Sequence, residues 1–254
     1  MADHRRAASW RLVAALGVTQ IVSWGTLYYA FSLMIDAFAG ATHVARSGVV
    51  GAFSVALLVT GLASAPVGRL IDRHGGRAVM TAGSAAAAVL LAALAFVTSA
   101  WQLYAAWALL GLVMAATLYD PAFAVLVQAF EERQRKAITA LTLFGGFAST
   151  VFWPLTQVLL QRFGWQGALL ALGAINLLVC VPLHWWMLPA APAIARKTNE
   201  QRAGKDAASL LDATFIGLCA AFTGNALVFS AMSVHLIPLL QGKEIGRASC
   251  RERV

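Results

Sequence analysis

Hydrophobic residues form long uninterrupted runs along this chain, and short polar segments separate them. A helix of about 20 apolar residues crosses a hydrocarbon core about 30 Å thick. By this measure the sequence predicts seven membrane spans, at residues 12–35, 47–67, 78–98, 101–128, 137–161, 166–188 and 213–240. The runs are much longer than barrel strands, and backbone amides left unpaired in lipid are costly, so we expect helices. The pattern indicates an all-α, polytopic membrane protein.

The composition excludes a water-soluble domain. Of the 254 residues, 60% are hydrophobic and 12% are charged, and the mean hydropathy is +0.73. A soluble domain carries about 25% charged residues. The polar residues of this chain are too few to cover a soluble protein of its length, so we expect a lipid bilayer around it.

Positive charge is concentrated in the polar segments that fall on one side of the membrane. Thirteen basic residues lie there: Arg5, Arg6, Arg11, Arg69, Arg73, Arg77, Arg133, Arg135, Lys136, Arg196, Lys197, Arg202 and Lys205. Between the spans, the other side has Arg46 and Arg162. Because cytoplasmic loops are enriched in Lys and Arg, we expect the N-terminus (residues 1–11) to be cytoplasmic. We expect the protein itself to lie in the cell's inner (plasma) membrane. The net charge of +8 then reflects the membrane topology and the contact of basic loops with anionic lipid headgroups. No sequence motif indicates nucleic-acid binding.

The segment GRLIDRHGGRAVM, residues 68–80, lies between the second and third spans and is rich in charge and glycine. One interpretation is a short basic turn with no further role. The spacing of its glycines and charged residues favours a further role for the segment. Gly68 permits a close approach where the second helix ends, and a tight turn at Gly75 follows the acid Asp72. Such an acid can make or release contacts as helices tilt.

This segment resembles the signature loop of the major facilitator superfamily, G-x-L-x-D-R-x-G-x-R. Its fixed positions are occupied by Gly68, Leu70, Asp72, Arg73, Gly75 and Arg77. The resemblance implies a secondary transporter of twelve helices, in two six-helix halves that alternate access to a central site. In that scheme the loop is a conformational switch that acts as a latch. Asp72 is the acid of the latch, and Arg73 and Arg77 are the basic residues around it.

The resemblance also suggests how the chain is divided. Residues 12–189 correspond to a six-helix N-terminal bundle, 190–212 to a cytoplasmic linker, and 213–240 to one helix of the C-terminal bundle. Five further spans are expected, so we interpret the chain as truncated, with its own missing C-terminal half as a partner. The final EIGRASCRERV, residues 244–254, back-translates to a sequencing-library adapter and is expected to be an artefact. The alternative is a natural charged tail.

Polar residues inside the spans indicate candidate positions on a solute path, because burying them in lipid is costly. In the first span, Gln20, Trp24 and Tyr28 recur at intervals of four on one helical face. This face either lines a cavity or packs, with Gln20 bonded to a neighbouring helix.

Asp120 is the one acid well inside a predicted span, between Tyr119 and Pro121 in the fourth. Low dielectric favours a protonated carboxyl, which makes proton coupling possible. The alternative is that Asp120 bonds a backbone group freed by the proline. In the seventh span, Asn225 could contact a solute and His235 could titrate near neutral pH, or either could simply pack.

These features favour a secondary active transporter of a small solute, with an organic acid as the candidate cargo and protons as the candidate coupling partner. The first and fourth spans resemble bacterial carriers of the monocarboxylate-porter type, and Trp107 stands where many sugar and drug carriers have an arginine. A non-transporting seven-helix receptor or scaffold is the alternative. No compact catalytic set is present, so we expect no enzyme. Cys180 and Cys219 show no metal-site or disulfide spacing, and we expect no cofactor and no metal.

Overall fold

A computed structural model describes residues 2–130 and 133–189, together with positions 217, 220, 221 and 224. All regular structure in these ranges is helical, which confirms the all-α expectation. The linker at 190–212 and the tail at 244–254 lie outside the described residues. So does the predicted helix at 213–240, with Asn225 and His235, apart from the four isolated positions. Residues 1–195 form one compact unit.

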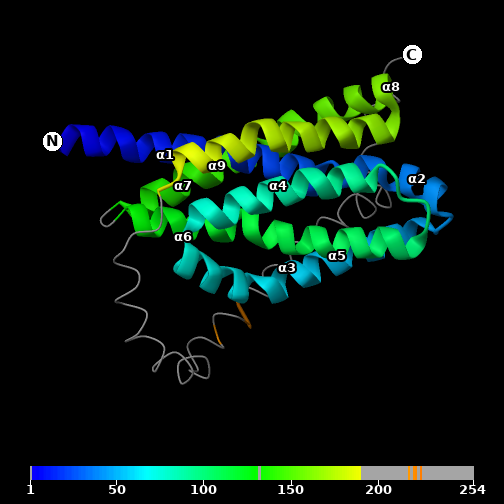
Figure 1. The fold of residues 1–254 in the computed structure, drawn as a ribbon, viewed down its shortest axis with the longest axis horizontal. Helices are drawn as coiled ribbons and strands as arrows, with labels where there is room; N and C mark the ends of the chain where they lie inside the picture. The colour runs from blue at the N-terminus through cyan, green and yellow to red at the C-terminus, as the bar shows by residue number, and fades with distance from the viewer. Residues whose placement is uncertain (1, 131–132, 190–216, 218–219, 222–223, 225–254) are drawn as a thin grey trace, which may run out of the picture. The chain divides into compact units, whose positions relative to one another are not determined.

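The unit is built from helices that run lengthwise beside one another (Figure 1). In chain order they are α1 (Ala2–Trp24), the π-helix η1 (Gly25–Tyr29), α2 (Phe31–Thr42), α3 (Arg46–His74), α4 (Gly76–Leu94), α5 (Ala100–Thr117), α6 (Tyr119–Ala129), α7 (Gln134–Gly146), α8 (Ala148–Ile175), the π-helix η2 (Asn176–Cys180) and α9 (Val181–Met187). Of these, α1, η1 and α2 form one continuous stretch, and α3 packs along α5.

Five continuous helical stretches are long and apolar enough to cross a membrane: Trp10–Thr42, Arg46–His74, Gly76–Leu94, Ala100–Ala129 and Gln134–Met187. The last contains 54 residues, more than twice what one crossing needs. Inside it, Gly164 leaves the helical region at φ 67° and ψ −179°. The chain turns back there (Figure 1), between the predicted spans at 137–161 and 166–188. The described part of the chain therefore makes six crossings.

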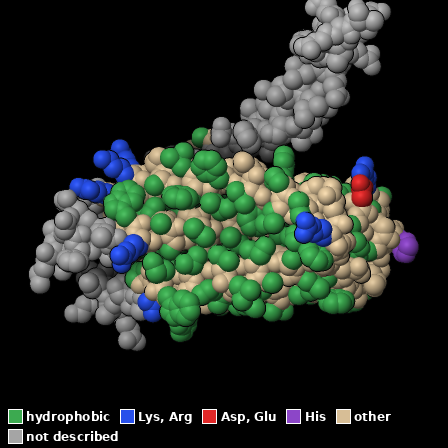
Figure 2. All heavy atoms as spheres, turned by 90° about the horizontal axis from the view of Figure 1, so that it is seen from above, with side chains coloured by type: hydrophobic (Ala, Val, Ile, Leu, Met, Phe, Trp, Pro, Cys, Tyr) green, Lys and Arg blue, Asp and Glu red, His purple; other side chains and the backbone are tan. Residues whose placement is uncertain are grey.

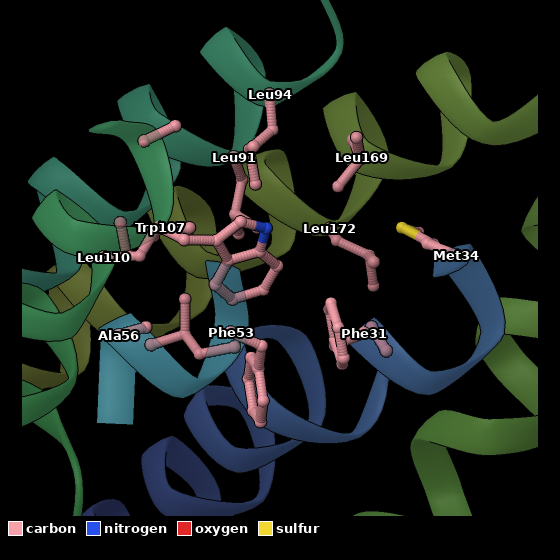
Figure 3. Close-up of a cluster of buried hydrophobic side chains, with 14 of the residues drawn as sticks. Phe31, Met34, Phe53, Ala56, Leu91, Leu94, Trp107, Leu110, Leu169 and Leu172 are labelled. Atoms are coloured by element: carbon pink, nitrogen blue, oxygen red, sulfur yellow. The ribbon is translucent and has the colours of Figure 1, made fainter. Parts of the chain in front are cut away.

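The buried side chains form two hydrophobic clusters. We call the larger one the aromatic cluster, because the rings of Phe31, Phe38, Phe53 and Trp107 lie in it. Figure 3 shows Trp107 among side chains of α3, α4 and α8. We call the second one the loop-end cluster, because it lies where the signature loop joins α4. Its buried members are Leu12, Val13, Leu16, Met80, Ala122, Val125, Leu126, Phe130, Ala137, Leu141 and Leu188.

The surface of the unit is largely apolar. Figure 2 shows hydrophobic side chains spread over the visible face, with Lys and Arg mainly toward one end. Leu62, Phe96 and Trp186 are each more than 70% exposed. Apolar patches of this extent are unfavourable in water and mark contact with lipid or protein. The fold and the surface together define a polytopic helical membrane protein.

Candidate functional site

The signature loop is a tight turn with one special backbone position. α3 ends at His74, and Gly75 adopts φ 81° and ψ 154° before α4 begins at Gly76. This region of backbone space is essentially restricted to glycine. The Gly75 N–H donates to the Ile71 carbonyl at 2.7 Å and closes the end of α3. The glycine at this position of the motif is thus required by backbone geometry.

Two polar contacts connect the loop to other helices. Arg77 Nε donates to the Leu188 carbonyl at the end of α9, at 2.7 Å. Gln128 Nε2 of α6 lies 3.5 Å from Asp72 Oδ1, at the limit of a hydrogen bond. Arg77 therefore fixes the loop to the last crossing of the unit, while Asp72 is exposed and only weakly held.

The other motif residues face outward from the described unit. Leu70 is 45% exposed, and Arg73 is exposed. A Cβ added at Gly68 would meet no atom within 4 Å, so the close approach expected there is not made with any described residue. Gly68, Leu70, Asp72 and Arg73 lie in the last two turns of α3, and we call this end of the helix the latch surface.

The structure brings three of the predicted path residues together. The rings of Trp24 and Tyr119 lie 5.0 Å apart, and those of Trp24 and Tyr28 lie 5.3 Å apart. All three side chains are partly exposed. Tyr29 and Phe123 extend the group, with Tyr29 at 5.4 Å from Tyr28 and Phe123 stacked on Tyr119 at 5.2 Å. We call these five residues, with Trp153 of α8 at 6.4 Å from Tyr29, the aromatic wall.

Asp120 lies at the edge of the aromatic wall and is exposed in the described unit. Its Oδ2 lies 3.0 Å from the hydroxyl of Ser64 on α3. The same hydroxyl lies 2.9 Å from the Thr60 carbonyl, so its single proton can serve either acceptor. Ser64 was not among the residues that the sequence pattern indicated. The bond to Ser64 also differs from the alternative considered for Asp120, a contact with backbone freed by the proline.

Gln20 is fully buried. Its Nε2 donates to the carbonyls of Thr117 at 2.9 Å and Leu118 at 3.3 Å, where α5 ends. Of the two interpretations left open for Gln20, the structure therefore shows the bond to a neighbouring helix. The Gln20 Oε1 has no hydrogen-bond partner among the described residues.

Further buried polar groups join the last crossing to its neighbours. Asn176 Nδ2 donates to Thr26 Oγ1 between the two π-helices, and Ser84 of α4 lies 3.0 Å from His184 Nδ1. Cys180 is buried, with its sulfur 3.9 Å from Ser23 Oγ. These contacts are internal to the bundle and fix helix positions. Within the described residues, no group of three or more His, Cys, Asp or Glu side chains could hold a metal.

Known proteins resemble this chain over most of its length. Residues 13–246 match the sequence profile described as Major Facilitator Superfamily. Monocarboxylate transporter 11 of Mus musculus is 33% identical over 170 residues, which cover 66% of this chain and 37% of the relative. Monocarboxylate transporter 13 of Rattus norvegicus is 30% identical over 170 residues, covering 66% and 39%. Monocarboxylate transporter 12 of Xenopus laevis is 33% identical over 119 residues, covering 46% and 26%.

The profile match covers far more than half of the chain, so this polytopic helical protein belongs to the Major Facilitator Superfamily. The match includes the signature loop and runs on beyond the linker. Membership of a family of membrane transporters confirms the expectation that the chain is not an enzyme. The chain spans less than two fifths of the length of the curated relatives named above.

Proposed function

We propose that this chain is the N-terminal part of a secondary active transporter that moves a small monocarboxylate across the plasma membrane by alternating access. The observation that supports this most directly is the juxtaposition of Asp120 with the aromatic wall on an exposed face of the six-crossing unit. An exposed carboxyl beside partly exposed rings suits a solute path better than a lipid contact. Family membership favours a transporter over the seven-helix receptor.

The cargo assignment draws on the relatives, which are named monocarboxylate transporters. The protein encoded by the complete gene should therefore be purified and reconstituted into lipid vesicles. Labelled monocarboxylates are then supplied with and without an inward proton gradient. We expect uptake that the gradient increases. Uptake of neutral or cationic solutes with no uptake of any monocarboxylate would overturn the cargo assignment.

The orientation can be tested separately. The excess of basic residues on one side supports a cytoplasmic N-terminus and a cytoplasmic signature loop. Cysteines placed at Arg69 and Arg73 should be protected from an impermeant thiol reagent added to intact cells, whereas a cysteine at His43, in the loop after α2, should be labelled. The opposite result would invert the topology.

The latch surface is proposed to contact the second half of the transporter and to stabilise its outward-facing state. Asp72 is exposed and weakly bonded within the described unit, so its carboxylate remains available to another partner. In the complete transporter Asp72→Asn should lower turnover with membrane insertion intact. A contact worth about 1.4 kcal/mol corresponds to about a tenfold change. Asp36→Asn, which changes an exposed acid in the middle of α2, is the matched control, and unchanged transport in Asp72→Asn would remove the latch assignment.

Asp120 is proposed to carry the coupling proton. The side chain has one hydroxyl partner, Ser64, and is fixed by no basic residue among the described ones. Asp120→Asn should transport without any response to the proton gradient, while Asp120→Glu should keep the response. A gradient effect that persists in Asp120→Asn would count against this role.

A further inference from the structure

The fourth crossing is interrupted at its middle. α5 ends at Thr117, Leu118 is extended at φ −80° and ψ −153°, and α6 begins at Tyr119. In a continuous helix the N–H of residue 121 would donate to the carbonyl of residue 117. Residue 121 is proline, which has no N–H. The Thr117 carbonyl has therefore lost its helical donor for a reason visible in the sequence.

Gln20 supplies the missing donor from another crossing. Its two amide protons serve the carbonyls of Thr117 and Leu118. The hydroxyl of Thr117 is occupied elsewhere, because it donates to the Val113 carbonyl at 2.8 Å. Gln20 and Thr117 are both fully buried, and a buried carbonyl without a donor is costly where no water can replace it.

The same two crossings touch again one turn further along α1. Trp24, four residues after Gln20 on α1, packs on Tyr119, the first residue of α6. Asp120 follows and meets Ser64. Gln20 thus holds the backbone just before the break, and Trp24 holds the side chain just after it.

We propose that Gln20 is a positioning residue, which stabilises the break in the fourth crossing and so sets where Tyr119 and Asp120 lie in the solute path. Gln20 acts on transport through the Thr117 carbonyl, and contact with the cargo is not required. The effect on transport rests on the proposed function. The replacement of the missing helical donor by Gln20 does not depend on what the protein transports.

The sharpest test uses Pro121 as the second site. Gln20→Leu removes the donor at similar volume, and Pro121→Ala restores the N–H that a continuous helix would direct to the Thr117 carbonyl. If Gln20 replaces that N–H, the double variant should recover most of what Gln20→Leu loses. The first readout is the thermal unfolding midpoint of the chain in detergent, which is independent of transport. Thr19→Val is the control, because Thr19 is an equally buried neighbour whose hydroxyl donates within its own turn, to the Leu16 carbonyl.

The second readout is the pH profile of uptake by the complete transporter. We expect Gln20→Leu to shift the pH of half-maximal uptake by at least about 0.3 unit, a twofold change in proton affinity, and the double variant to return toward the wild type. A loss of folded protein alone would lower the amount of uptake without moving this midpoint. A changed KM with an unmoved pH profile would assign Gln20 to the cargo instead and overturn the proposal.

The two readouts separate the possible failures. Additive effects of Gln20→Leu and Pro121→Ala on the unfolding midpoint would show that Gln20 does not act through Thr117, and the proposal would fall whatever the protein transports. Recovery of stability in a protein that transports no solute would leave the hydrogen-bond substitution standing and overturn the proposed function.

Discussion

The two hydrophobic clusters of the bundle are stabilised in different ways. The aromatic cluster depends on ring packing: Phe31 stacks on Phe53 at 4.2 Å, and Trp107 meets both edge-on at 5.0 and 5.2 Å. The loop-end cluster has one aromatic side chain among its buried members, Phe130. Next to it are a glycine-only turn at Gly75 and the bond from Arg77 to Leu188. The aromatic cluster thus depends on side-chain volume, and the loop-end cluster depends on backbone geometry.

The break in the fourth crossing lies between the two clusters. Most buried apolar side chains of α5, and Leu118 after it, belong to the aromatic cluster. Ala122, Val125 and Leu126 of α6 belong to the loop-end cluster. Gln20 and Thr117 form a buried polar layer at this level. Since a packed apolar core resists deformation, we expect the aromatic cluster to move as a rigid body. The loop end, with fewer rings and a turn that only glycine can adopt, is the better candidate for a switch.

The largest expected effect is in the aromatic cluster. Trp107 is 2% exposed, so Trp107→Ala leaves a large cavity and should lower the free energy of unfolding by about 3–5 kcal/mol. Trp101→Ala is the control on the same helix, because Trp101 is 72% exposed. Denaturant titration in detergent would measure both. Equal losses for the two tryptophans would refute the distinction between core and surface on α5.

A smaller effect is expected in the loop. Gly75→Ala forces a Cβ into a region that costs on the order of 1–3 kcal/mol. Gly68→Ala, seven residues earlier, adds a Cβ to open space inside a helix and should gain about 0.5–1 kcal/mol of stability. Comparing the unfolding free energies of the two variants tests the backbone account. If Gly68→Ala is stable and yet impairs transport, the latch surface gains support.

Much of the fold could be predicted from the sequence, because the bilayer sets a minimum length for each helix. The predicted gap between residues 161 and 166 contains Gly164, where the chain reverses. The signature loop was also found from sequence, since its Gly75 is required by local backbone geometry. Such features depend on near neighbours in the chain.

The contacts of the site residues could not be predicted in this way, because the partners lie far away in the sequence. Ser64 meets Asp120 across 56 positions, and Gln20 meets Thr117 across 97. Tyr29 was missed for a different reason. The π-helix η1 (Gly25–Tyr29) aligns residues about five apart, so Tyr29 lies near Trp24, a pairing that a period of 3.6 does not predict. Asn225 and His235 stay predictions.

The smallest effect is expected for an ion pair at the end of the bundle nearer the aromatic cluster. Arg46 pairs with Asp36, and both side chains are about 70% exposed, so solvent screens their attraction and side-chain ordering offsets it. Arg46→Gln should therefore leave the unfolding midpoint unchanged within error. Arg77→Gln is the counterpart at the loop end, where the lost bond to the Leu188 carbonyl should cost about 1 kcal/mol. A larger loss for Arg46→Gln would mean that surface charge stabilises the end that we assign to ring packing.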